Sequence, residues 1–142
     1  MNDSGRLEQL RAIPMFAGIP EDALTRLAER ASDFEAPAGH VLVQPNEPGS
    51  GVLILVSGRA TVELGNRSID TGAGECIGEL ALILDDVVHT ARVRAVTEVH
   101  GLAISRADFT ELLATDASIA GALLRVLARR LIAADNMLTV GP

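Results

Sequence analysis

The sequence contains no tryptophan and no tyrosine, and its aromatic residues make up only 2% of the chain. Apolar residues nevertheless account for 48% of the sequence, so the core must be built from leucine, valine, isoleucine and alanine. At 142 residues the chain has a common size for one domain and is long enough to bury a full core. The sequence therefore predicts a single domain over residues 1–142 with an aliphatic interior.

Cysteine and long apolar runs are also scarce. The single cysteine, Cys76, has no partner for an internal disulfide, which favours a reducing compartment, and we interpret it as a small buried core residue rather than a redox thiol. No apolar run approaches the roughly 20 residues of a membrane span. The polar N-terminus lacks the apolar region of a signal peptide. We therefore expect a cytoplasmic protein without a membrane span.

Basic residues are outnumbered, with 12 Lys and Arg against 19 Asp and Glu and a net charge of −7. Binding to a phosphate backbone needs a basic face, so we expect no direct contact with nucleic acid. No nucleophile with an adjacent base is recognisable, which predicts no catalytic residue and no enzyme activity. His40, His89 and His100 fall on separate elements without metal-ligand spacing, so we predict no metal and no cofactor.

The hydrophobic period changes twice along the chain. Residues 1–32 show helical spacing, residues 33–105 alternate with period two between Gly-rich turns, and residues 106–136 return to helical spacing after Ser105, a suitable N-cap. The segment 52–56 is apolar at every position, which is typical of a strand covered on both faces. This order predicts a mainly β fold with flanking helices, a double-stranded β-helix or jelly roll.

The most informative stretch is 74–94, GECIGELALILDDVVHTARVR. It predicts a turn, a very short helix starting at Gly78, a loop and a strand. Glycine lets the backbone approach a ligand closely, and the free N–H groups of a helix start favour an anion. A carboxylate there, Glu79, would repel the anion unless it held another part of the same ligand, such as two sugar hydroxyls. The stretch therefore predicts a small ligand with one phosphate and one ribose.

The same stretch resembles the phosphate-binding cassette of the cyclic-nucleotide-binding domain family, found in catabolite activator proteins and protein kinase A regulatory subunits. GELAL, an acidic loop and HTARVRA carry the resemblance, which extends from about Phe16 to Leu131. It implies N-terminal helices, a jelly roll, a short cassette helix and a C-terminal helix pair. It also implies a regulatory domain that senses cAMP or cGMP and relays the signal through movement of the C-terminal helix to an effector or partner that the sequence does not identify.

The resemblance assigns a role to each residue that matches the family pattern. Gly78 would let the backbone approach the ligand, and Glu79 would accept a hydrogen bond from the ribose 2′-hydroxyl. The backbone N–H groups of Leu80 and Ala81 would face the cyclic phosphate. Thr90 would add a hydroxyl donor. These residues, together with His89, form the predicted ligand site.

His89 departs from the family pattern, because it stands where the family has its phosphate-pairing arginine. Arginine carries a permanent charge and a two-pronged donor, whereas histidine is charged only near or below a pH of about 6.5. Losing one charged hydrogen bond of about 1.5–3 kcal/mol would weaken binding about 10- to 100-fold. If His89 pairs with the phosphate, affinity should rise as the pH falls. Compensation by Arg92 is disfavoured, because strand alternation places Arg92 on the opposite face.

The departure at His89 leaves a second interpretation open, in which the chain is a degenerate member of the fold that serves as a protein interaction or dimerisation module without binding nucleotide. The last helix offers a seam for a homodimer through Leu123, Val126, Leu127 and Leu131. Its arginines are interpreted as a polar face or as partners of the helix dipole: Arg125, Arg129 and Arg130. Ala134 and Asp135 stand where some family members hold adenine with Thr and Ser, so the sequence does not indicate which base is preferred.

Overall fold

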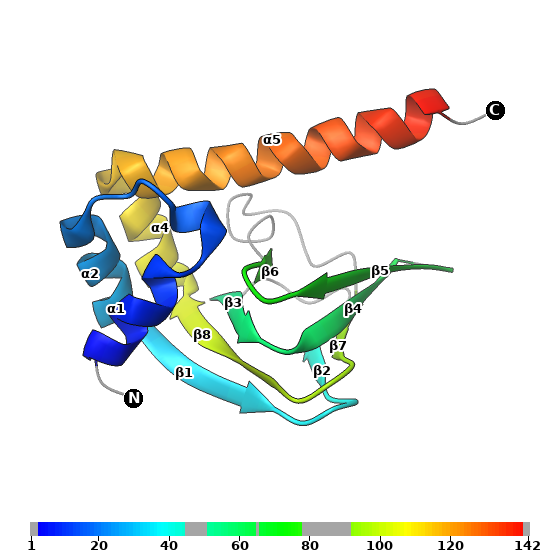
Figure 1. Cartoon of the computed structure of the whole chain (residues 1–142), viewed down its shortest axis with the longest axis horizontal. Helices are drawn as coiled ribbons and strands as arrows, with labels where there is room; N and C mark the ends of the chain where they lie inside the picture. The colour runs from blue at the N-terminus through cyan, green and yellow to red at the C-terminus, as the bar shows by residue number, and fades with distance from the viewer. Residues whose placement is uncertain (1–2, 45–50, 65, 78–91, 141–142) are drawn as a thin grey trace.

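The computed structural model describes residues 3–44, 51–64, 66–77 and 92–140. Figure 1 shows α1, α2 and α4 gathered at one end of two sheets, with α5 running from that end along one side of the molecule. The helices are α1 (Asp3–Arg11), the 3-10 helix η1 (Pro14–Phe16), α2 (Glu21–Arg30), α4 (Arg106–Thr115) and α5 (Ala117–Val140). The strands are β1 (Ala31–Ala36), β2 (Val41–Val43), β3 (Gly51–Ser57), β4 (Arg59–Leu64), β5 (Arg67–Gly72), β6 (Cys76–Ile77), β7 (Arg92–Ala95) and β8 (Val99–Ser105).

The strands form two antiparallel sheets with the orders β1-β8-β3-β6 and β2-β7-β4-β5. Apart from the hairpin of β4 and β5, neighbours in each sheet are not consecutive in sequence, as in a jelly roll, because the chain crosses repeatedly from one sheet to the other. The fold class predicted from the sequence, a jelly roll with helices at both ends, is confirmed by these two sheets and their flanking helices.

Strand β3 is covered on both faces, as its apolar run predicts. Val52 and Ile54 belong to a cluster shared with the helices, whereas Leu55 belongs to a second cluster between the sheets. The first cluster draws on α1, η1, α2, α4 and α5 and covers the outer face of the sheet that contains β3. The second is formed by Ala36, Leu55, Ala60, Ile77, Val93, Ala95 and Val99. Aliphatic side chains thus fill both clusters, and β3 contributes residues to each of them.

The helix ends follow the local sequence. Ser105 accepts a hydrogen bond from the backbone N–H of Asp108 at 3.2 Å, so it caps α4 as predicted. The first turn of α2 carries Glu21 and Asp22, where carboxylates favour the positive end of the helix dipole. The buried stripe of α2 consists of Ala23, Leu24, Leu27 and Ala28.

The predicted seam on α5 is wrong at Leu123 and Leu127. Leu123 is buried, with 5% of its surface exposed, and Leu127 packs against the same helix-side cluster, so both serve the chain's own core. Up to Ile132, where the description of its side chains ends, α5 exposes three large hydrophobic residues: Leu124 at 66%, Leu131 at 64% and Ile132 at 59%. Helical periodicity predicted the apolar face correctly near the start of α5 but not at Leu131, which does not belong to the helix-side cluster of described residues.

Candidate functional site

All six predicted ligand-binding residues, Gly78, Glu79, Leu80, Ala81, His89 and Thr90, lie in the segment 78–91, outside the residues that the structure describes. The predicted cassette helix lies there too. What the structure provides is the frame around this segment: the strands on either side of it, the apolar surface between the sheets and the helix α5.

The strand before the segment is held by a chain of backbone hydrogen bonds. Gly74 has a positive φ of 91°, and its N–H donates to the carbonyl of Leu55 at 2.7 Å. A positive φ is a conformation that glycine adopts readily and other residues rarely do. In return, the N–H of Leu55 donates to the carbonyl of Glu75 at 3.0 Å, and β6 then pairs Ile77 with Leu53. The chain therefore reaches position 78 from a fixed edge of the β1-β8-β3-β6 sheet.

The strand after the segment belongs to the other sheet. β7 lies between β2 and β4, with Val93 and Ala95 buried in the cluster between the sheets. Arg94 alternates with them on the opposite face, where it donates to the carbonyl of Gly39 at 3.2 Å. Arg92 shares that face by alternation within β7. The segment 78–91 therefore connects the two sheets.

The surface between the sheets is apolar and incompletely covered. Several hydrophobic side chains that pack against the inner cluster stay partly exposed: Phe34, Leu42, Val43, Leu53 and Val62. Partly exposed apolar side chains gain free energy when another apolar surface covers them. No local sequence pattern singled out these residues of β1, β2, β3 and β4 as part of a site.

Arg130 connects α5 to the strand before the segment. Its guanidinium Nη2 donates to the backbone carbonyl of Cys76 at 2.7 Å and lies 3.8 Å from the Glu75 carboxylate. The sequence interpretation of Arg130 as part of a polar face or as a dipole partner missed this contact, because the two residues are 54 positions apart. Position 78, where the predicted site begins, follows Cys76 by two residues. A residue on the last long helix therefore contacts the chain immediately before the predicted site.

Cys76 is a core residue, as predicted. It is 3% exposed, and its burial raises the pKa of the thiol to about 12. The thiol therefore stays protonated at neutral pH, whereas a redox-active cysteine needs a thiolate. Its place beside the predicted site is structural: it fills the layer under the helices while its carbonyl receives Arg130.

Within the described ranges of the chain, no three His, Cys, Asp or Glu side chains gather so that they could hold a metal ion. Among the same residues, no helix is both long enough and apolar enough to cross a membrane.

Comparison with known proteins gives consistent results. The family model described as "Cyclic nucleotide-binding domain" matches residues 34–116. A CRP-like cAMP-activated global transcriptional regulator of Mycobacterium tuberculosis is 31% identical over an alignment of 139 residues. The match covers 92% of this chain and 61% of the regulator. The chain therefore spans less than two thirds of that relative.

Two solved structures illustrate the likeness of fold. The catabolite activator protein of Thermus thermophilus is 27% identical with a TM-score of 0.76, and the match covers 89% of this chain and 62% of that one. The regulatory subunit of a cAMP-independent protein kinase A from Trypanosoma brucei is 23% identical with a TM-score of 0.77, covering 90% of this chain and 45% of that one. The second likeness concerns the fold alone.

Proposed function

Because the chain belongs to the cyclic nucleotide-binding domain family, we propose that it is a regulatory domain that binds cAMP or cGMP in the segment 78–91 and relays occupancy through α5. Glu79 accepts the ribose hydroxyl, the amides of Leu80 and Ala81 receive the cyclic phosphate, and His89 and Thr90 complete the phosphate contacts. The ligand lies against the partly exposed hydrophobic side chains that pack on the cluster between the sheets.

The observation that carries the proposal is the position of the segment. It is flanked by Ile77 in β6, at the edge of one sheet, and by Arg92 in β7, inside the other. A ligand bound there contacts both sheets. It also lies close to Cys76, whose backbone carbonyl accepts a hydrogen bond from Arg130. Ligand binding therefore shifts α5, because the hydrogen bond from Arg130 connects α5 to β6.

Calorimetric titration with cAMP and with cGMP tests the proposal. We expect saturable heat with one of them at up to millimolar ligand, and no heat with either would eliminate nucleotide binding. Glu79→Gln should weaken binding about 10- to 100-fold through loss of a charged hydrogen bond. Glu29→Gln, the same change at an exposed position of α2, is the matched control and should bind like the parent chain.

A second candidate function rests on the exposed apolar stripe of α5, formed by Leu124, Leu131 and Ile132. These side chains lie on one side of the helix, and an exposed apolar stripe of this kind indicates a protein contact. The stripe supports a dimerisation module that uses a second copy of the chain, whether or not nucleotide binds. The Trypanosoma brucei structure with this fold is the regulatory subunit of a cAMP-independent protein kinase A.

Sedimentation equilibrium tests the dimer. The parent chain should show a dimer that the double variant Leu124→Gln with Leu131→Gln converts to monomer. Ile69→Gln changes an exposed apolar side chain on β5, 48% exposed, and should leave the dimer intact. A parent chain that stays strictly monomeric and binds nucleotide would reject the dimerisation module.

A further inference from the structure

The junction between α4 and α5 is a single buried residue. α4 ends at Thr115 and α5 begins at Ala117, so Asp116 alone turns the chain, in an extended conformation with φ −128° and ψ 100°. Its side chain is only 5% exposed. A buried carboxylate is costly unless it is paired and hydrogen-bonded, so its partners decide whether the junction is stable.

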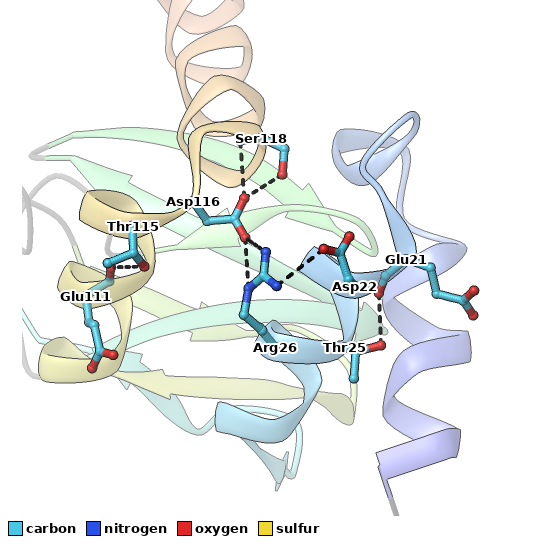
Figure 2. A network of polar contacts seen from close by, with 8 residues as sticks. All are labelled: Glu21, Asp22, Thr25, Arg26, Glu111, Thr115, Asp116 and Ser118. Carbon is cyan, nitrogen blue, oxygen red and sulfur yellow. Dashed lines mark hydrogen bonds and ion pairs between the residues drawn. The ribbon is translucent and has the colours of Figure 1, made fainter.

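The two carboxylate oxygens of Asp116 have different partners, as Figure 2 shows. Oδ1 accepts hydrogen bonds from the backbone N–H of Ser118 at 3.2 Å and from the Ser118 hydroxyl at 2.6 Å, which caps the start of α5. Oδ2 accepts from Nε of Arg26 at 3.2 Å and also from Nη2 of Arg26. One oxygen therefore serves α5, and the other binds α2.

Arg26 brings a cation to the junction from a distant part of the chain. It lies on α2, 90 residues before Asp116, and its Nη1 also contacts Asp22 one turn earlier at 3.5 Å. The Asp22 side chain is 75% exposed, so this second contact is a surface pair of small value. The contact with Asp116 is different, because this carboxylate is buried.

α2 contacts α4 through another arginine. Arg30, four residues after Arg26, pairs with Glu111 at 2.9 Å and approaches Asp108 at 3.5 Å. These carboxylates lie on α4 itself and are 57% and 40% exposed. Arg30 therefore holds α4, whereas Arg26 holds the residue at which the chain changes direction.

We propose that Arg26 and Asp116 form a junction lock, a conformational device that fixes the direction in which α5 leaves α4 by binding the junction to α2. With the lock closed, the first turns of α5 move together with α2. Any movement of α5 relative to the roll then carries α2 with it or breaks the lock. The device follows from the contacts of the junction and does not depend on nucleotide binding.

The distance between two spin labels tests the lock without ligand. The labels are placed at exposed positions through Glu29→Cys on α2 and Arg125→Cys on α5, in a Cys76→Ala background. With the lock intact we expect one narrow distance distribution. Arg26→Met and Asp116→Asn should each broaden it, although asparagine still caps α5 through its carbonyl oxygen. The double variant should be no broader than the broader single one, because both changes remove the same contact.

Two variants serve as controls. Ser118→Ala removes a hydroxyl from the cap but leaves Arg26 on Oδ2, so the distribution should stay narrow. Arg30→Met removes an ion pair of the same kind from the same helix, but one directed at α4, and should also leave it narrow. A narrow distribution in Arg26→Met, or equal broadening in Arg30→Met, would overturn the lock.

Cooperative thermal unfolding establishes that each labelled variant folds. If Arg26→Met does not fold, Arg26→Lys keeps the charge and loses the two-nitrogen contact, so it should broaden the distribution to a smaller extent. An unchanged distribution in Arg26→Lys would then reject the lock. Because no nucleotide is present, either result leaves the test of cAMP and cGMP binding untouched.

Discussion

At the scale of single residues, His89 sets the strength of nucleotide binding in our proposal. Arginine at this position would supply a permanent charge and a second donor to the cyclic phosphate. We therefore expect His89→Arg to raise affinity about 10- to 100-fold in a calorimetric titration at pH about 7.5. Arg92→Gln, three residues later and on the face of β7 away from the inner cluster, should leave affinity unchanged. Equal affinities of His89→Arg and the parent chain would contradict a phosphate contact at position 89.

Asp116 makes stability depend on pH. Hydrogen bonds from Ser118 and then from Arg26 lower the pKa of its carboxyl from the usual 3.8. Because the pKa is lower in the folded than in the unfolded chain, the ionised carboxylate contributes its full stabilisation above about pH 4 and loses it as the pH falls through the folded value. Asp116→Asn should flatten this part of the profile in urea unfolding, whereas Glu111, whose pKa is lowered by Arg30, keeps its own share. An unchanged slope would contradict the assignment.

The contacts of the junction lock and of Arg130 could not be predicted from single positions of the sequence. An acidic residue such as Asp116 before an apolar period is a common helix cap, and this is a local pattern. The contact of Asp116 with Arg26 has no such pattern, since Arg26 lies 90 residues away and no local period connects the two. The same holds for Arg130, whose acceptor is a backbone carbonyl that any residue would provide at position 76. Long-range polar contacts depend on the packing of elements.

At the scale of elements, β8 and β3 must approach closely at Gly101. A Cβ built there would lie 2.3 Å from the carbonyl oxygen of Ile54 and 2.5 Å from the Phe34 ring. The carbonyl belongs to a paired strand and cannot move aside without breaking the β3–β8 pairing. Gly101→Ala should therefore destabilise the fold by about 1–3 kcal/mol in urea unfolding.

Gly121 provides the matched comparison. It lies within α5, where an added Cβ would meet no atom closer than Nη1 of Arg125 at 3.7 Å. Gly121→Ala should stabilise the fold by about 0.5–1 kcal/mol, because glycine is a poor helix residue. Opposite signs for the two substitutions are expected, and equal destabilisation would show that the close approach at Gly101 is not the cause.

Element-scale features were the most predictable part of the fold. The change of hydrophobic period marked the helical and β regions, and the unbroken apolar run of β3 indicated a strand between two layers. Periodicity also gave the direction of the apolar face of α5, but not how far the core extends beneath it. Leu123 has the helix-side cluster to pack against, and Leu131, two turns later, does not. How far the core extends beneath α5 depends on how the helices and strands pack together, which the period of one helix does not indicate.

At the scale of the whole molecule, the crossing of the chain between the two sheets is what makes a site possible. The segment 78–91 leaves the β1-β8-β3-β6 sheet after Ile77 and joins the other sheet at Arg92, and α5 reaches the same place through Arg130. The roles of Gly78, Glu79, Leu80, Ala81, His89 and Thr90 remain predictions from the family pattern, because these residues lie outside the described ranges.

A crystal structure of the chain grown with cAMP and, in parallel, with cGMP tests the central proposal most directly. We predict density for one nucleotide between Ile77 and Arg92, with the ribose 2′-hydroxyl on Glu79 and the cyclic phosphate on the amides of Leu80 and Ala81. A structure at saturating ligand in which neither nucleotide occupies this position, or in which side chains of the protein fill it, would contradict the account.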